Sequence, residues 1–600
     1  MNRHYVLLFA LALLVGGLYI GPQLLIREQL KEKGEPHIIL QLNKHSDETN
    51  IYLPRAQEVY NGHWPPRDLH FKDGSPSAFP ALPSLLAGSF IGLAGGNVNS
   101  AFLALNFVFP ALAFLLFYLT AWVLTKNKLW SVFVGLAGVL TPVALHLPRA
   151  FKGLGLFGDI VAKNFVPIIR TPLDVLFLSR FDDPLLTLGF YLAAITSLYL
   201  FWSWPSVKRA VWAGLWAGLL FHVYLYYSFY WLAVVGLLFI YVLLFKRGDR
   251  PLIKNLLTLI AVMALVSAPY FINYINLKGL DSYQDYVFRV GTEVGRGFRL
   301  ASVWFEYLAY LILAALVWLF YWKKKKEKQK AVLFWVFILA LFLVWNIQLL
   351  TGFVPHPGHW RKAAAPILFF ILTGFAFDFY AHYQSRLKPA AKKLAAGLLI
   401  LASLLLVAKK AANVWAFKNL PQDELKRYSF NKDIYDSWDW INSNLKGEPA
   451  ILTDSFLTSV YLSGYTAVRA YLPMAQFTSR ANAELEERYL AASKIFGVSE
   501  SKLRTNLTAT DDPFYLYSSF YREKNFDYAF TSSDKSVPQE KIEELVARYR
   551  ALSVSLTDIE VDYIYYGPWG KEITLADFKN NPALELVYSN PSVEIYKISK

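Results

Sequence analysis

Apolar segments of about twenty residues recur along this chain, and they restrict its fold more than any other feature of the sequence. A helix of about 20 apolar residues crosses a hydrocarbon core about 30 Å thick. Such segments occupy residues 5–26, 100–125, 129–147, 184–204, 209–226, 227–245, 254–276, 301–322, 331–350, 363–383 and 394–414. The sequence therefore predicts an α-helical polytopic membrane protein with about 11 transmembrane helices, the first of them retained rather than cleaved as a signal.

The composition supports a membrane protein and excludes several other classes. Of the 600 residues, 55% are hydrophobic, and the mean hydropathy is +0.31. The net charge of +15 does not indicate nucleic-acid binding, because the basic residues gather in short loops between the apolar segments. The absence of cysteine excludes disulfides, thiolate catalysis and cysteine-ligated zinc.

Basic residues identify the cytoplasmic side. The strongly basic connections lie at residues 126–128, 208–209, 246–254, 323–330 and 386–393. All of them fall on one side if the chain begins inside and Phe79–Leu93 does not span, and the positive-inside rule makes that side cytoplasmic. Phe79–Leu93 is short and carries two prolines, so we expect a helix that dips in from the outer face; the alternative is a full span. We expect a multi-pass protein of a prokaryotic plasma membrane.

The long connections then collect on the outer face, at residues 27–99, 148–183, 277–300 and 351–362. The polar C-terminal part contains the stretches EPAILTDSF, VDYIYYGPW, LELVYSN and SVEIYKIS, which are typical of short strands. PQEKIEELVARYRAL has apolar residues at helical spacing. We therefore expect a transmembrane domain over residues 1–424 and an extracytoplasmic mixed α/β domain over residues 425–600.

The first outer loop carries an acidic pair, Asp47 and Glu48, in the stretch SDETNIYLPRAQEVYNG. Ser46 and Asp47 are good N-cap residues, and Asn-Gly is a typical helix end, so we expect an amphipathic helix that rests one face on the membrane surface, with Pro54 as a kink. In one interpretation Asp47 only caps this helix and Glu48 is solvated. In the other, the carboxylates act in catalysis at the membrane surface.

An N-terminal helix, an outer loop that starts with Asp-Glu, and a Tyr/Arg-rich amphipathic helix ending at NGHW together resemble the GT-C superfamily of membrane glycosyltransferases. The likeness is nearest to the branch of protein O-mannosyltransferases and aminoarabinose transferases. It implies transfer of a sugar from a polyprenyl-phosphate donor to a lipid, glycan or protein, by a single displacement with inversion. It also implies that Asp47 is the base, with Glu48 in support and Arg55 as a basic neighbour.

Two further outer loops carry candidate residues. LSRFDDPLLT places Arg180, Asp182 and Asp183 at the mouth of a span, where an ordinary helix start is the alternative. In some GT-C branches an acidic pair in this loop binds a divalent cation, so Asp47, Asp182 and Asp183 are candidate ligands of Mg²⁺ or Mn²⁺. Whether a metal is required stays open.

TGFVPHPGHWRKAAAP brings His356, His359, Arg361 and Lys362 to the outer side. The positive-inside rule predicts few basic residues on that side, so we expect these residues to bind a lipid phosphate. Interfacial anchoring and a two-histidine metal site are the alternatives.

The loop YVFRVGTEVGRGFRL carries Arg289 and Arg296. It is expected either to form a lid over the substrate or to touch anionic lipid headgroups.

A transporter or flippase of a lipid-linked or small polar solute is the alternative function. Such proteins carry charges at mid-membrane and often an internal repeat. Here the ionisable residues gather at one face, and the exceptions Glu306 and Asp378 lie near the ends of spans. That distribution favours chemistry at the membrane surface.

Overall fold

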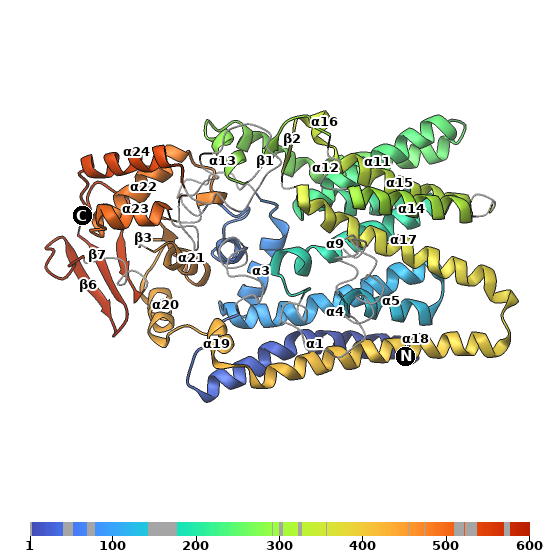
Figure 1. Ribbon diagram of the computed structural model, residues 1–600, viewed down its shortest axis with the longest axis horizontal. Coiled ribbons are helices and arrows are strands. Elements are labelled where there is room, and N and C mark those ends of the chain that lie inside the picture. The colour runs from blue at the N-terminus through green and yellow to red at the C-terminus, as the bar shows by residue number, and fades with distance from the viewer. Residues whose placement is uncertain are drawn as a thin grey trace.

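The computed structural model describes the chain over residues 3–39, 52–68, 79–141, 177–290, 292–298, 304–321, 324, 327–355, 357–453, 455–472, 475–508, 516, 521, 537–568 and 576–599. It is an elongated molecule in which long helices run side by side and a smaller part with strands sits at one end (Figure 1).

Within the described residues, nine helices are long and apolar enough to cross a membrane. They are α1 (Arg3–Glu32), α4 (Val98–Thr125), α9 (Leu188–Ser203) together with the π-helical turn before it, α11 (Leu225–Phe245), α12 (Arg250–Lys278), α14 (Trp304–Tyr321), α15 (Lys328–Trp345), α17 (Trp360–Tyr383) and α18 (Pro389–Trp415). The predicted polytopic helical fold is therefore confirmed.

The two other predicted spans form shorter helices. α5 (Lys128–Leu140) corresponds to the segment 129–147, whose last residues lie outside the described chain. α10 (Val207–Leu219) is followed by a 3₁₀ turn, Leu220–His222, rather than by one continuous helix to residue 226. Whether these two complete the predicted set of about 11 spans stays a prediction.

α3 (Leu82–Leu93) is the helix predicted to dip in from the outer face. Twelve residues rise only about 18 Å, which is too short for a core of about 30 Å. α3 packs against α4 and against α2 (Leu53–Tyr60), at the end of the bundle next to the strand-containing part (Figure 1).

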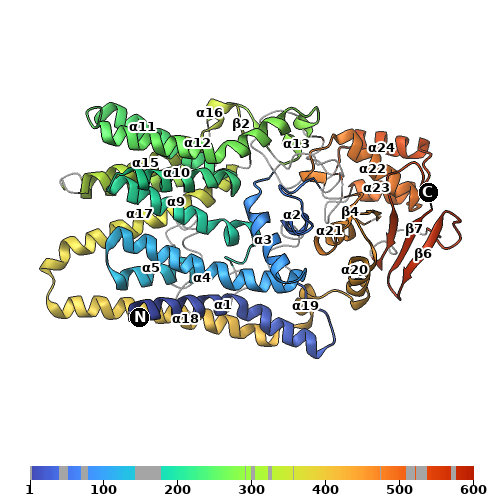
Figure 2. The same ribbon diagram turned by 180° about the vertical axis from the view of Figure 1, so that it is seen from behind.

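α2 differs from the amphipathic surface helix that the sequence predicts. The α-helix begins at Leu53 with Tyr52 as its N-cap, and Pro54 lies in the first turn, where proline is tolerated. The predicted cap at Ser46 and Asp47 lies outside the described residues. Six of its eight residues are buried, because α2 packs between α3 and α21 (Phe456–Tyr465) (Figure 2). The predicted end at Asn-Gly is confirmed, with Gly62 at φ +96°.

The C-terminal part is built on a five-stranded sheet of order β4-β3-β5-β7-β6. β3 (Ala450–Leu452) lies parallel to β4 (Arg469–Ala470) and to β5 (Tyr563–Tyr566), while β7 (Glu594–Ile598) lies antiparallel to β5 and to β6 (Leu584–Ser589). Its helices include α20 (Lys432–Asn444), α22 (Asn482–Ile495), α23 (Glu500–Thr508) and α24 (Gln539–Ala551). All four predicted strands and the predicted helix at α24 are present.

Two apolar clusters hold this part together. One lies between the sheet and α22–α24, around Phe496, Leu545 and Ile564. The other is shared with the outer loops and joins Ala56 of α2 and Ile91 of α3 with side chains of α20, α21, β5 and β7. A continuous apolar cluster thus crosses the region between the bundle and the C-terminal part, and the boundary near residue 425 stays a prediction.

Two small elements join the third and fourth outer loops. β1 (Thr292–Val294) pairs antiparallel with β2 (Phe353–Pro355), and α13 (Tyr283–Arg289) precedes β1. These elements lie at the end of the bundle next to the C-terminal part, whereas the connection between α17 and α18 lies at the other end (Figure 1). This separation agrees with the predicted placement of the long loops on one side and the basic loops on the other.

Candidate functional site

Several predicted site residues cannot be placed. Asp47, Glu48 and His356 lie outside the described residues, and Asp182 is described in its backbone but not in its side chain. Their roles stay predictions. The remaining candidates fall into two groups, one that meets at the outer end of the bundle and one that holds loops together.

Asp183 is the centre of the first group. It is buried at the start of the span that continues through α9. Its Oδ1 accepts hydrogen bonds from the Thr187 hydroxyl at 2.8 Å and from the Tyr227 hydroxyl at 3.0 Å, and its Oδ2 pairs with Lys362 Nζ at 2.9 Å. A residue that only begins a helix does not need hydrogen-bond donors from two other helices, as Asp183 has in Tyr227 of α11 and Lys362 of α17. Asp183 therefore joins α9, α11 and α17.

Lys362 comes from the first turn of α17 and is 29% exposed, so its ammonium is both paired and accessible. The ammonium also lies 5.6 Å from the centre of the Tyr224 ring. The Tyr224 hydroxyl hydrogen-bonds to His359 Nδ1 at 2.9 Å, and the ring of Tyr226 lies 4.9 Å from the ring of His359. We call Asp183, Thr187, Tyr224, Tyr227, His359 and Lys362 the outer-face cluster.

The first outer loop lies close to this cluster. Burial raises the pKa of Tyr224, and the charge of Asp183 adds to that effect, so the hydroxyl keeps its proton and can donate it to His359. Tyr52, the residue before α2, is among the groups that interact electrostatically with Tyr224. Arg180 similarly interacts electrostatically with Asp183. The cluster therefore gathers side chains from two of the four predicted outer loops and from α11, and Tyr52 brings the first outer loop near it.

Arg361 lies next to the cluster in sequence, but its guanidinium is engaged elsewhere. Its Nε and Nη2 both contact Glu306 Oε1 at 2.7 Å, and its guanidinium lies 5.6 Å from the ring of Trp345. Glu306 is buried in the first turn of α14. The pair ties α17 to α14, which accounts for an acidic residue near the end of a span. A direct phosphate contact by Arg361 stays a prediction.

Arg289 holds the C-terminal part rather than opening onto the outer-face cluster. It is fully buried, and its terminal nitrogens donate to the Asn482 side chain, to the Thr478 carbonyl at 2.9 Å and to the Arg480 carbonyl at 2.6 Å. Asp285 from α13 accepts from the Asn482 amide at 2.9 Å. The loop predicted to be a lid is therefore bound, over α13, to the connection between α21 and α22.

The two other predicted arginines also bind backbone carbonyls. Arg296 Nη1 donates to the carbonyls of Leu349 and Leu350 at 2.7 and 3.1 Å. Buried Arg55 donates to the carbonyls of Phe79 and Pro80 at 3.1 and 3.4 Å. Both contacts tie outer loops to neighbouring segments, so a substrate-binding role for either residue has no support in the contacts described.

A second polar group connects the first outer loop with the sheet. Glu58 of α2, His63, Arg67, Glu448 and Arg469 form one network. Arg67 Nε lies 3.0 Å from Glu58 Oε2 and its Nη2 lies 2.7 Å from Glu448 Oε2. Burial opposes ionisation of Glu448, but hydrogen bonds from Arg469 and Arg67 outweigh it and lower its pKa.

Glu58, His63 and Glu448 have the spacing of a metal site, and within the described residues they are the group that fits that description. His63 Nδ1 lies 2.6 Å from Arg67 Nη2, and His63 Nε2 lies 3.1 Å from Glu448 Oε1. Both ring nitrogens are thus engaged, and two arginines already balance the two carboxylates. The donor set fits an ion-pair network that joins α2 to the sheet, not a cation site.

The partners of Asp183 could not be identified from sequence spacing. Tyr224 and Tyr227 look like an interfacial aromatic belt in FHVYLYYSFY, and Thr187 is one of many hydroxyls. Lys362 stands out only as a basic residue on the side where few are expected. The signal that links these residues is spatial, since Asp183 and Lys362 lie far apart in the chain.

No family model matches the chain, and no curated protein matches its sequence. Among solved structures it is similar to ArnT from Cupriavidus metallidurans, in a crystal structure bound to undecaprenyl phosphate and in one of the apo state. In both cases the identity is 15% and the TM-score 0.40, and the match covers 100% and 99% of this chain and 98% of the other. A likeness of this degree says nothing about substrate or acceptor.

Proposed function

We propose that this protein is a membrane glycosyltransferase that takes a sugar from a polyprenyl-phosphate carrier at the outer membrane face. The observation that supports the proposal most is the outer-face cluster. It presents an accessible ammonium, Lys362, beside a tyrosine and a histidine at the end of an apolar bundle. A lipid phosphate needs both properties, because its chain is apolar and its head is anionic.

The proposed reaction is one displacement at the anomeric carbon. The bond from that carbon to the phosphate oxygen breaks, and the electron pair leaves with the phosphate. An acceptor hydroxyl or amine forms the new bond from the opposite face, so the configuration inverts, and its proton passes to a carboxylate. Asp47 is our candidate for that base, supported by Glu48. Lys362 would balance the charge that develops on the departing phosphate.

Asp183 is assigned a positioning role. Its buried carboxylate pairs with Lys362 and fixes the direction of the ammonium. Both of its oxygens are already engaged by protein donors. This donor set does not fit a divalent cation at Asp183, and a cation site at the other two candidates, Asp47 and Asp182, stays a prediction.

The test uses the purified protein in nanodiscs with a panel of polyprenyl-phosphate sugars. We expect one donor to release its polyprenyl phosphate in the presence of an acceptor fraction from cell envelopes, with inversion shown by NMR of the product. Asp47→Asn should lower the rate by roughly 10²-fold or more, the scale of general-base catalysis. A protein that moves the lipid between leaflets but never breaks the sugar–phosphate bond would be a transporter, and the proposal would be wrong.

The role of Lys362 is tested separately with undecaprenyl phosphate as the probe. Lys362→Met should weaken its binding by about tenfold, because the charge-assisted contact to phosphate is lost. Lys254→Met is the matched control, since Lys254 is an exposed lysine at the basic end of α12. Equal affinities for the two variants would remove Lys362 from the phosphate site.

A further inference from the structure

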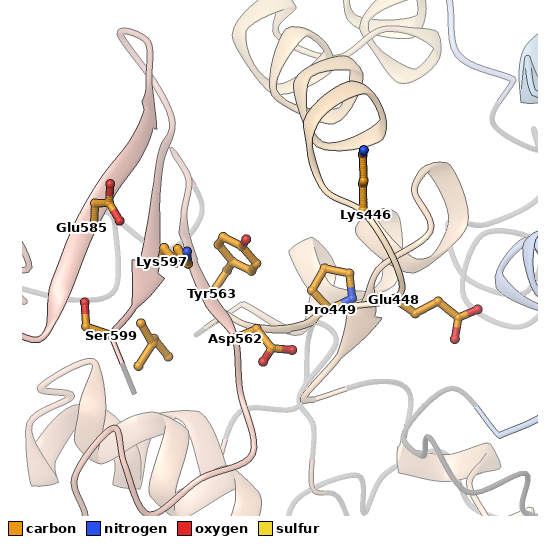
Figure 3. Close-up of a pocket in the computed structure, with 9 residues that line it drawn as sticks. Lys446, Glu448, Pro449, Asp562, Tyr563, Glu585, Lys597 and Ser599 are labelled. Atoms are coloured by element: carbon orange, nitrogen blue, oxygen red, sulfur yellow. The ribbon is translucent and has the colours of Figure 1, made fainter.

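The C-terminal sheet carries a pocket that none of the proposed chemistry uses. Its volume is about 610 Å³, within the range of about 300–1,000 Å³ in which proteins hold ligands of several hundred daltons. It lies at one edge of the sheet, where β3, β5 and β6 begin and β7 ends. Figure 3 shows Tyr563 between the strands that carry Glu585 and Lys597 and the turn that carries Lys446.

Three charged side chains of this pocket, Glu585, Lys597 and Lys446, form no ion pairs with one another in the described part of the chain. Glu585 and Lys597 face each other in the register of β6 and β7, where opposite charges normally pair. Among the residues that the structure describes, neither has an ion pair, and Lys446 across the pocket has none either. One carboxylate and two ammonium groups are therefore available to a ligand.

The other two carboxylates of the pocket are fixed. Asp562 Oδ2 accepts a hydrogen bond from the Ala450 amide at 2.9 Å, so its position is set by the first residue of β3. Glu448 turns its carboxylate away from Tyr563 (Figure 3), toward Arg67 and Arg469, which balance its charge. The two lysines and the two carboxylates of Glu585 and Asp562 thus contribute equal numbers of basic and acidic side chains to the lining.

These features together select a ligand class. A balanced pocket gives no advantage to a phosphate or to a polycation, since like charges oppose either one. Many separate donors and acceptors around an aromatic ring suit a ligand with many hydroxyl groups and an apolar face. We infer that this pocket binds a short neutral saccharide, with its hydroxyls on Glu585, Lys597, Asp562 and Lys446 and one sugar face on Tyr563. The inference does not require that the protein be a transferase.

Direct binding measurements on the full chain test this. The protein is held in nanodiscs rather than in a maltoside detergent, whose headgroup is itself a sugar. Maltotriose, cellotriose and N,N′-diacetylchitobiose are the probes, measured by calorimetry and by saturation-transfer NMR up to about 10 mM. We expect saturable binding of at least one probe at one site per chain. The double variant Glu585→Ala/Lys597→Ala should weaken it by about tenfold or more, because hydrogen bonds to two charged groups are lost.

Matched controls keep the result independent of folding. Glu540→Ala and Lys502→Ala remove an exposed carboxylate and an exposed ammonium from α24 and α23, away from the pocket, and should leave binding unchanged. All variants should keep the wild-type melting temperature, since Glu585 and Lys597 are exposed and make no ion pair in the described structure. Absence of saturable binding for all three probes, or binding that the pocket variants leave intact, would overturn the inference.

Discussion

Lys362 and Asp183 form a partly buried ion pair where α9, α11 and α17 meet. Its contribution to the free energy of unfolding differs from that of a surface ion pair. Asp183 is 6% exposed and Lys362 29% exposed at their side chains. Removing one partner leaves the other charge in a poorly solvated place, so a single substitution costs more than the pair contributes. Solvent reaches Lys362, which reduces that cost below the value for a fully buried pair.

Because removing one partner costs more than the pair contributes, the effects of substituting Asp183 and Lys362 should be coupled. Asp183→Asn keeps an oxygen that can accept from Thr187 and Tyr227 but removes the charge that faces Lys362. We expect it to lower the free energy of unfolding by about 1–3 kcal/mol. Lys362→Met should lower it by more, because it leaves the more deeply buried Asp183 carboxylate without its counter-charge. In the double variant the uncompensated charge is gone, so the two losses should not add, with an interaction energy of about 0.5–3 kcal/mol. Denaturation in detergent measures all three variants, and strictly additive losses would show that the pair is not coupled.

At the scale of elements, the crossing of α2 and α3 depends on one glycine. A Cβ added to Gly88 would lie 2.6 Å from the Ala56 carbonyl oxygen and 2.6 Å from Val59 Cβ. Real Cβ atoms do not approach backbone oxygen so closely, so α2 would have to move away from α3. α2 follows directly on the loop that holds Asp47 and Glu48, and its displacement would change the position of that loop.

We therefore expect Gly88→Ala to destabilise the protein by about 1–3 kcal/mol and to lower transfer activity more than it lowers binding of undecaprenyl phosphate. Gly236→Ala is the control, because nothing lies within 4 Å of a Cβ at that position of α11. Melting temperatures and turnover are compared for both variants. A Gly88→Ala protein that is as stable and as active as the Gly236→Ala protein would mean that α2 is not held by this crossing.

Elements were predictable from the sequence wherever one segment decides its own structure. An apolar run of twenty residues makes a helix in a membrane because every backbone group must be bonded within the segment. The strands β3, β5, β6 and β7 were recognisable as short apolar stretches within the polar C-terminal part. β4 has only two residues and takes its place from pairing with β3, so it carries no signal of its own.

The start of α2 and the contacts of Arg289 depend on partners instead. Within the described residues α2 begins at Leu53, where Pro54 fixes the first turn, and its place is set by packing against α3 and α21. Arg289 appeared available to substrate because its loop looked exposed, whereas the segment Thr478–Asn482 covers it. For the same reason the pairing of Asp183 with Lys362 was not predictable, since it needs the packing of α9 on α11 and α17.

At the scale of the whole molecule, His37 stands where the bundle joins the C-terminal part. It follows α1, its carbonyl accepts from Asn99 at 2.8 Å, and Ile38 beside it donates to the Tyr428 carbonyl at 2.8 Å. Its Nε2 lies 3.1 Å from Gln23 Oε1. Burial, with a smaller contribution from Arg27, lowers the pKa of His37 from 6.5 to about 4.

The sign of the resulting pH dependence follows from linkage. Between pH 6.5 and about 4 the unfolded chain binds a proton at His37 that the folded chain does not, so stability falls as the pH falls through that window. The loss attributable to this group is at most about 3.5 kcal/mol, at about 1.4 kcal/mol per pH unit. His37→Gln should reduce the pH dependence of the melting temperature over that window. His382→Gln, which replaces an exposed histidine in the last turn of α17, should leave that dependence unchanged. Parallel curves for wild type and His37→Gln would contradict this assignment.

Glu448 has a consequence that reaches beyond its own ion pairs. It lines the pocket of the C-terminal sheet and also binds Arg67, which holds Glu58 of α2. A ligand that draws this carboxylate toward itself must loosen Arg67, and a movement of α2 must change what the pocket offers. Such a coupling is reciprocal. If a ligand in the pocket changes the affinity for a ligand at the loop beside α2 by some factor, a ligand at that loop changes the pocket's affinity by the same factor. The Glu448 carboxylate would then couple the first outer loop to the pocket of the C-terminal sheet.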